Sequence, residues 1–245
     1  MFLRSSSIFC LIVCVALISG SLSHRHHHQY QNHQRKCSKN THFDYFLLAA
    51  QWPETFCSQH NCIKFQDHWS IHGMWPQNFD QSYPSFCCSN HTYDHRLIKP
   101  LESELIAYWK EIQSGKDNDW FWSHEYTKHG TCAIECPLMH DELGYFNSTL
   151  QVFKKLQIEK WLARSNITPS YKASYSVVHF QRALQRGSGH KVSLHCSKNH
   201  QGDIVVAEIY FCLRKTNLER FDCVLPNSKC GDYMLKYYPQ KKFIL

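Results

Sequence analysis

Residues 70–76 read SIHGMWP and residues 121–132 read FWSHEYTKHGTC, and these two stretches decide how the rest of the chain is interpreted. Each contains at least one histidine beside aromatic residues. The second holds His124, Glu125, Lys128 and His129 within six positions. Imidazoles, a carboxylate and an ammonium group placed so closely can transfer protons and bind an anion.

The sequence around these stretches predicts both strands and helices. Phe43–Trp52 and Trp69–Trp75 are aromatic and apolar and each stops at a proline, as buried strands do. Leu97–Ile112 has the apolar spacing of a helix, and Asp119–His129 predicts another that stops at Gly130. Further helices are expected at 141–165 and 177–185, and further strands at 192–196 and 204–213. Helices interleaved with a few long apolar strands indicate an α+β fold.

The N-terminus is typical of a secretory signal peptide over residues 1–23. Arg4 precedes an apolar run from Ile8 to Ile18 that is too short to span a bilayer, and small residues follow. A signal anchor is the competing interpretation. Residues 24–39 (HRHHHQYQNHQRKCSK) are basic and histidine-rich without hydrophobic periodicity, and we interpret them as an arm. Residues 40–245 then form one domain, which has the size of a single substantial core.

The cysteines indicate an oxidising compartment. Of 13 cysteines, Cys10 and Cys14 lie in the signal segment, and the remaining 11 are scattered without a CxxC pair, which favours disulfides over zinc. An odd number leaves at least one thiol free or paired outside the chain. Glycosylation sequons begin at Asn90, Asn147 and Asn166, and together with the signal they predict a secreted glycoprotein. The formal charge of +7 permits a polyanionic partner without requiring one.

On a helix over Asp119–His129, residues four apart share a face. Glu125 and His129 form one such pair, which couples a carboxylate to an imidazole. His124 and Lys128 form the adjacent pair and suit a phosphoryl group that gains negative charge. The set contains no obvious nucleophile, so it suits a substrate that supplies one, as RNA does with its 2′-hydroxyl group. The alternative is that these four residues are surface charges that form ordinary ion pairs without a functional role.

A zinc site is a second alternative, because His-Glu-x-x-x-His resembles a zincin motif. Zincins need histidines four residues apart, whereas His124 and His129 are five apart, about 140° around a helix. We therefore predict no metal and no cofactor at this site.

IHGMWP and SHEYTKHGTC closely resemble the two active-site segments of the ribonuclease T2 family, usually written HGLWP and HEWxKHGTC. The resemblance extends over most of residues 43–235 and includes QWPETFC at 51–57. Met74 and Tyr126 depart from the usual Leu and Trp but keep apolar or aromatic character. The resemblance implies one α+β domain with a central, mainly antiparallel sheet flanked by helices and stapled by disulfides.

The resemblance also implies roles for the ionisable residues. His129 would be the general base that takes the 2′-hydroxyl proton, and His72 the general acid that protonates the departing 5′-oxygen. His124, Glu125 and Lys128 would hold the phosphate and stabilise the transition state, with Glu125 beside the base. The product would be a 2′,3′-cyclic phosphate, formed without a metal.

Base-binding positions follow from the same resemblance, because single-stranded RNA is read by aromatic stacking and edge contacts. Gln51, Trp75, Tyr83 and Phe121 match positions that line base pockets in the family, although each could instead belong to the core. Some relatives carry Asp where this chain has Gln77, which leaves the base preference open.

The disulfide pairs are likewise implied by the resemblance. Cys87 and Cys88 are adjacent, so either could bond Cys132, and Cys37, Cys88 and Cys136 are left over in the implied scheme. That scheme pairs Cys57–Cys62, Cys87–Cys132, Cys196–Cys230 and Cys212–Cys223.

The leading hypothesis is a secreted, metal-independent endoribonuclease acting on single-stranded RNA as a monomer without a membrane anchor. Its destination is the extracellular space, with a lysosome or vacuole as alternatives. A secreted effector or signalling glycoprotein that acts through binding partners is the alternative function, and intact His72 and His129 favour the enzyme. Metal or polyanion capture by the arm at 24–39 is a third hypothesis.

Overall fold

The computed structural model describes residue 37 and residues 41–63, 65, 67–231 and 234–240. The predicted signal peptide and all of the predicted arm except Cys37 lie outside these residues. Among the residues described, no helix is both long and apolar enough to cross a bilayer.

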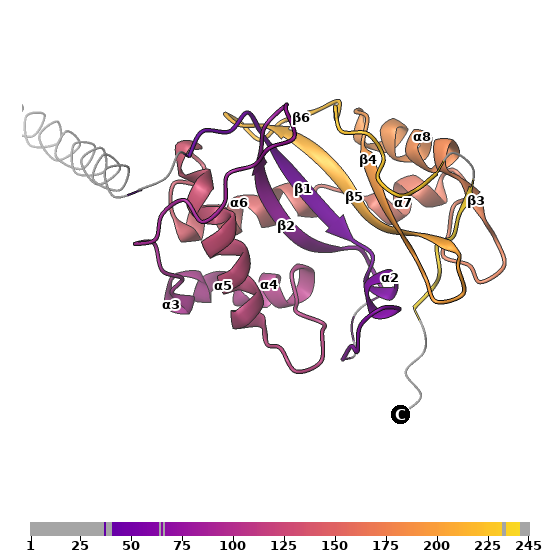
Figure 1. The fold of residues 1–245 in the computed structure, drawn as a ribbon, viewed down its shortest axis with the longest axis horizontal. Coiled ribbons are helices and arrows are strands. Elements are labelled where there is room, and N and C mark those ends of the chain that lie inside the picture. The colour runs from indigo at the N-terminus through magenta and orange to yellow at the C-terminus, as the bar shows by residue number, and fades with distance from the viewer. Residues whose placement is uncertain (1–36, 38–40, 64, 66, 232–233, 241–245) are drawn as a thin grey trace, which may run out of the picture.

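A central antiparallel sheet organises the chain (Figure 1). Its strands lie in the order β2-β1-β5-β4, and the short strand β6 pairs with β5. The strand bounds are β1 Tyr45–Gln51, β2 Ser70–Gln77, β4 Ser193–Lys198, β5 Ile204–Arg214 and β6 Arg220–Phe221. A second, two-stranded sheet pairs β3 (Tyr175–Ser176) with β7 (Met234–Leu235).

Helices flank the sheet, with α3, α4 and α5 on the side of β2 and α7 and α8 on the side of β4 (Figure 1). The α-helices are α2 Pro53–Cys57, α3 His95–Ile98, α4 Glu102–Tyr108, α5 Asn118–Lys128, α6 Glu142–Lys154, α7 Ile158–Ala163 and α8 Val177–Ser188. Two 3-10 helices, η1 Lys99–Leu101 and η2 Gly130–Glu135, follow α3 and α5. The architecture is the expected α+β domain.

The two faces of β1 have different neighbours because successive side chains of a strand alternate. Phe46, Leu48 and Ala50 belong to the main core, together with buried aromatic residues of α6 and α8. Tyr45 and Leu47 point the other way and join a smaller apolar cluster on the outer face of the sheet. That outer face carries the candidate site.

Most of the predicted elements are confirmed. The strands predicted at 43–52 and 204–213 are β1 and β5, and the helix predicted at 119–129 is α5. The strand predicted at 69–75 is β2, which continues through Pro76 to Gln77 rather than stopping at the proline. The prediction of one helix over Leu97–Ile112 is wrong, because the chain forms α3, η1 and α4 instead. Pro100 lies at this break, where its ring cannot continue a regular helix interior.

Five disulfides link the described residues. Four are the pairs that the resemblance implies, Cys57–Cys62, Cys87–Cys132, Cys196–Cys230 and Cys212–Cys223. The fifth joins Cys37 to Cys88, and Cys136 is a buried free thiol. Cys87 and Cys88 therefore connect the loop after β2 to two different parts of the chain, η2 and the segment that precedes β1.

Candidate active site

A β-bulge places His72 on the outer face of the sheet. Ala49 pairs with Gly73 and Ala50 with Ile71, so His72 is an extra residue in β2. In a regular strand His72 and Trp75 would face opposite sides, because they are three residues apart. The bulge turns His72 to the same face as Trp75, and their ring centroids lie 5.0 Å apart.

Gly73 allows this strand and helix α5 to approach closely. A Cβ atom at this position would lie 2.1 Å from Glu125 Oε2 and 2.2 Å from Trp75 Nε1. A side chain at this position would have to displace the Glu125 carboxylate and the Trp75 ring. The glycine of the HG pair is therefore required by packing around the carboxylate of Glu125.

His72 is held by a buried carboxylate from β5. Its Nδ1 lies 2.5 Å from Glu208 Oε1, and the hydroxyl of Tyr210 donates to Glu208 Oε2 at 2.6 Å. The backbone oxygen of His72 accepts a hydrogen bond from Trp109 Nε1 at 2.9 Å. Burial alone would lower the pKa of His72, but the charge and hydrogen bond of Glu208, aided by Glu125, raise it to about 9. His72 is thus an imidazolium at neutral pH.

Helix α5 brings Glu125 to the same place. The side chain of Asp117 caps the helix by accepting from the Trp120 N–H. Glu125 is buried one turn before the C-terminus, and Trp75 Nε1 donates to its Oε2 at 2.9 Å. Burial raises the pKa of Glu125, an effect that His72 and the Trp75 hydrogen bond oppose. Trp75, rather than the imidazole of His129, is thus the partner of the Glu125 carboxylate among the described contacts.

His129 lies at the C-terminus of α5 in an apolar setting. Its side chain is buried, its ring centroid lies 5.5 Å from that of Trp75, and its Nδ1 has no hydrogen-bond partner among the described residues. A helix C-terminus would favour the imidazolium by about 0.3–1 kcal/mol. Burial outweighs this and, with the positive charges of Lys128 and His72, lowers the pKa of His129 to about 3. His129 is therefore neutral where His72 is charged.

Lys128 and His124 lie on the adjacent face of helix α5 and complete the site. Lys128 is partly buried, whereas His124 is exposed and stacks on Trp120 with ring centroids 5.7 Å apart. Burial of part of the ring, followed by the charge of Lys128, lowers the pKa of His124. This effect of Lys128 agrees with the pairing of the two residues on one helix face.

Two pockets meet at this cluster and share His72, His124 and Glu125. The first has a volume of about 380 Å³ and the second about 170 Å³. The first is also lined by Leu47, Trp75, Gln77, Gln81, Tyr83, Lys128, His129, Tyr210 and Leu225. The second is also lined by Gln51, Phe56, Lys110, Glu111, Ile112, Gln113, Lys116, Trp120 and Phe121. The four predicted base-binding residues are thus divided, Trp75 and Tyr83 in the first pocket and Gln51 and Phe121 in the second.

Sequence reasoning missed Glu208 and Tyr210. They lie 136 and 138 positions after His72, in a strand that is otherwise apolar except for its last residue, Arg214. The sequence could have indicated Glu208, because a carboxylate inside a buried apolar strand needs a hydrogen-bond donor or a positive charge beside it.

The sequence model of the ribonuclease T2 family matches residues 43–223. The chain belongs to the ribonuclease T2 family. Both active-site segments lie inside the matched region, and the family assignment makes the protein a ribonuclease T2-type endoribonuclease that binds RNA.

Individual ribonucleases of this family are similar over most of the chain. Ribonuclease DdI of Dictyostelium discoideum is 35% identical over 190 residues, which cover 76% of this chain and 80% of the relative. Ribonuclease T2 of Homo sapiens is 28% identical over 232 residues, covering 93% of this chain and 84% of the relative. The crystal structure of RNase NT in complex with 5′-AMP has a TM-score of 0.74 at 29% identity, covering 81% of this chain and 100% of that chain.

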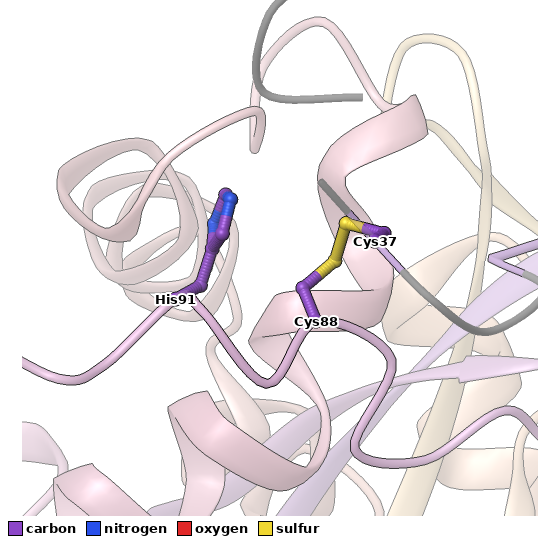
Figure 2. Close-up of side chains that lie close together, drawn as sticks. All are labelled: Cys37, Cys88 and His91. Atoms are coloured by element: carbon purple, nitrogen blue, oxygen red, sulfur yellow. A yellow bond between two sulfur atoms is a disulfide. The ribbon is translucent and has the colours of Figure 1, made fainter. Parts of the chain in front are cut away.

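Cys37, Cys88 and His91 are a group of potential metal ligands outside the candidate active site (Figure 2). Their donor atoms lie within 4.8 Å of one another. Cys37 and Cys88 are joined in a disulfide, however, and a metal requires thiolates. With the bridge closed only the imidazole remains as an ordinary ligand, so the group does not fit a metal centre of this ribonuclease T2 protein.

Proposed function

We propose that this ribonuclease T2 protein cleaves single-stranded RNA by transphosphorylation, with His129 as general base and His72 as general acid. The observation that carries the proposal is the opposite shift of two imidazole pKa values around one pocket, to about 3 for His129 and to about 9 for His72. Between these values one ring can accept a proton while the other can donate one.

The reaction balances with these two groups alone. The proton of the 2′-hydroxyl passes to His129 as the 2′-oxygen forms a bond to phosphorus. The bond from phosphorus to the 5′-oxygen breaks, and this oxygen takes the proton of His72. The products are a 2′,3′-cyclic phosphate and a free 5′-hydroxyl. Proton exchange with solvent, or hydrolysis of the cyclic ester with the roles reversed, restores His129 and His72.

Charge that develops on the phosphoryl oxygens is stabilised by groups of this chain. Lys128 and protonated His72 supply positive charge beside the pocket. Glu125 lies on the wall that the two pockets share, and burial raises the pKa of its carboxyl group. His124, on the shared wall of the two pockets, contacts the same phosphate. Proton transfer and charge stabilisation are both assigned to side chains, so the proposed reaction requires no metal.

The two pockets accommodate the bases on either side of the cleaved bond. They share His72, His124 and Glu125, so a phosphate held by these residues has one pocket on each side. Trp75 and Tyr83 offer aromatic surfaces in the first and Phe121 in the second. Bases must leave a duplex to enter such pockets, which favours single-stranded RNA. The 5′-AMP bound to RNase NT is consistent with nucleotide recognition on this fold.

We further propose that the protein is a secreted, glycosylated monomer. The five disulfides are consistent with an oxidising compartment. The side chains of Asn90, Asn147 and Asn166 are all exposed, as acceptors of a glycan must be.

The decisive test is incubation of the purified protein with defined RNA oligomers across pH 4–8, with and without EDTA. We expect a 2′,3′-cyclic phosphate by mass spectrometry, undiminished by EDTA. His72→Ala and His129→Ala should each lose about 10²–10⁴ in rate, the contribution of a positioned acid or base. His200→Ala, in the turn between β4 and β5, is the matched control and should keep full activity. Normal turnover in either active-site variant would overturn the assignment.

A further inference from the structure

An aromatic cluster lies next to the first pocket on the outer face of the sheet. Phe79 stacks on Tyr45 with ring centroids 5.1 Å apart and planes at 27°, and Phe221 meets Tyr45 edge-on at 5.6 Å. Arg214 places its Cζ 5.8 Å from the centre of the Phe221 ring. Tyr45 is buried beneath the other two rings, whereas Phe79 is 58% exposed.

The cluster continues the pocket in space. Leu47 lines the pocket and pairs with Trp75 on one side and Cys212 on the other. Tyr45 is two residues further along the same face of β1, roughly 7 Å away. It lies between Gln77, another residue of the pocket wall, and Arg214. The cluster is therefore within reach of a nucleotide that adjoins one held in the pocket.

Phe79 lies in a hydrogen-bonded turn. The backbone N–H of Asn78 donates to Ser82 O at 2.9 Å, and that of Gln81 donates to Asn78 O at 3.0 Å. The N–H of Phe79 donates to Asp44 Oδ2 at 2.9 Å, which fixes the turn to the start of β1. The same turn contributes Gln81 to the wall of the first pocket, so Phe79 lies next to that pocket.

The exposure and charges of the cluster select its ligand. One face of the Phe79 ring packs on Tyr45, and with 58% of the residue exposed the other face is open to a ligand. Asp44 and Asp80 lie beside it and disfavour a phosphate at this point, while exposed Arg214 supplies a cation next to Phe221. Such an arrangement binds a base by stacking, with its phosphate directed toward the arginine.

We propose that Phe79, Phe221 and Arg214 form an accessory subsite that stacks a base of the RNA chain outside the two nucleotides joined by the cleaved bond. The inference rests on the proposed function. The base is that of the nucleotide adjoining the one in the pocket of Trp75 and Tyr83. This subsite makes the enzyme prefer an extended strand over a dinucleotide.

The test uses oligomers with a single cleavable ribonucleotide and 2′-O-methyl nucleotides elsewhere, so that every molecule is cut at one bond. kcat/KM is measured for the dinucleotide and for oligomers extended by one nucleotide on the 5′ side or the 3′ side. Each extension carries either a base or an abasic residue. For the unaltered protein we expect one of the two extensions to raise kcat/KM about 5-fold or more, and only when the base is present.

Phe79→Ala should abolish this gain through KM while leaving the dinucleotide unaffected, and Phe79→Trp should retain it. Tyr171→Ala, at another exposed aromatic ring, is the matched control and should behave like the unaltered protein. Equal cleavage of the base-containing and abasic oligomers by the unaltered protein would overturn the subsite. This comparison uses only the unaltered protein, so it tests the subsite even if Phe79→Ala fails to fold. Cleavage of the dinucleotide without any gain from extension would reject the subsite alone, whereas absence of any cleavage would reject the proposed function.

Discussion

Replacing Glu208 by glutamine tests whether the carboxylate on β5 makes His72 the acid. Glutamine has the shape of glutamate and can still accept a hydrogen bond from Nδ1 of His72, which lies 2.5 Å from Oε1 in the structure. It lacks the negative charge. The substitution therefore separates the orientation of the imidazole from the electrostatic effect on its pKa.

The expected magnitude follows from the site. The pKa of His72 is about 9, above an ordinary value of 6.5, and burial without Glu208 would lower it. The His72 side chain is 34% exposed, so water screens part of the charge of Glu208. We expect Glu208→Gln to lower the pKa by about 1–2 pH units, or about 1.4–2.7 kcal/mol of stabilisation of the imidazolium. Because the acid must be protonated, activity is then lost near pH 7–8 rather than near pH 9.

The assay is kcat/KM for a dinucleotide from pH 4 to 10. In Glu208→Gln the alkaline limb should move to lower pH, with a small loss at pH 5 and a loss of about 3- to 25-fold at pH 8.5 for a pKa lowered by about 1–2 pH units. Tyr210→Phe is the matched control, because it removes only the hydrogen bond from Tyr210 to Glu208 Oε2 and should move the limb less. An alkaline limb at the same pH in Glu208→Gln would refute the reasoning, even if the rate fell at every pH.

Four further outcomes are expected. Gly73→Ala should reduce kcat/KM by about 10² or more without unfolding the protein, measured with circular dichroism, because its Cβ would lie 2.1 Å from Glu125 Oε2 and displace that side chain. Lys128→Ala should lower kcat at every pH with an unchanged melting temperature, since the lost charge acts on the transition state. The free energy of unfolding in urea should fall as the pH drops from 6.5 toward 3. In this range the imidazole of His129 binds a proton in the unfolded chain, where its pKa is 6.5, but not in the folded protein, where its pKa is about 3; His129→Leu should therefore reduce the pH dependence. Deleting residues 24–36 should leave dinucleotide cleavage unchanged and weaken binding to long RNA at low salt, measured by filter binding, because those residues are basic and contain neither active-site segment.

The parts of the fold that follow local rules could be predicted from the sequence. β1 and β5 are long apolar runs, and α5 ends where a glycine follows its last residues. The predicted helix at 97–112 shows why apolar spacing alone is not sufficient to place a helix. The apolar spacing continues across Pro100, but a proline cannot continue a regular α-helix, so the chain forms α3, η1 and α4. Apolar spacing thus located the helical region, but it did not show that this region is divided at Pro100.

The candidate site was predictable in its residues but not in its contacts. His72 reaches the outer face only through a bulge, and a bulge is defined by pairing with β1, which no local pattern displays. The spacing of Glu125 and His129 suggested a carboxylate–imidazole pair, yet the carboxylate is bound by Trp75, 50 positions earlier. Contacts between distant segments decide both cases.

The division of labour between the two histidines depends on their surroundings rather than on their residue type. Both rings lie beside Trp75, at 5.0 Å for His72 and 5.5 Å for His129, and both are removed from bulk water to some degree. Burial alone lowers the pKa of each imidazole. Only His72 has a carboxylate within hydrogen-bonding distance among the described residues, and its charge in turn helps to keep His129 neutral. In the proposed reaction, a single buried carboxylate on β5 therefore determines which ring donates the proton, and through that ring it also favours the free-base form of the other.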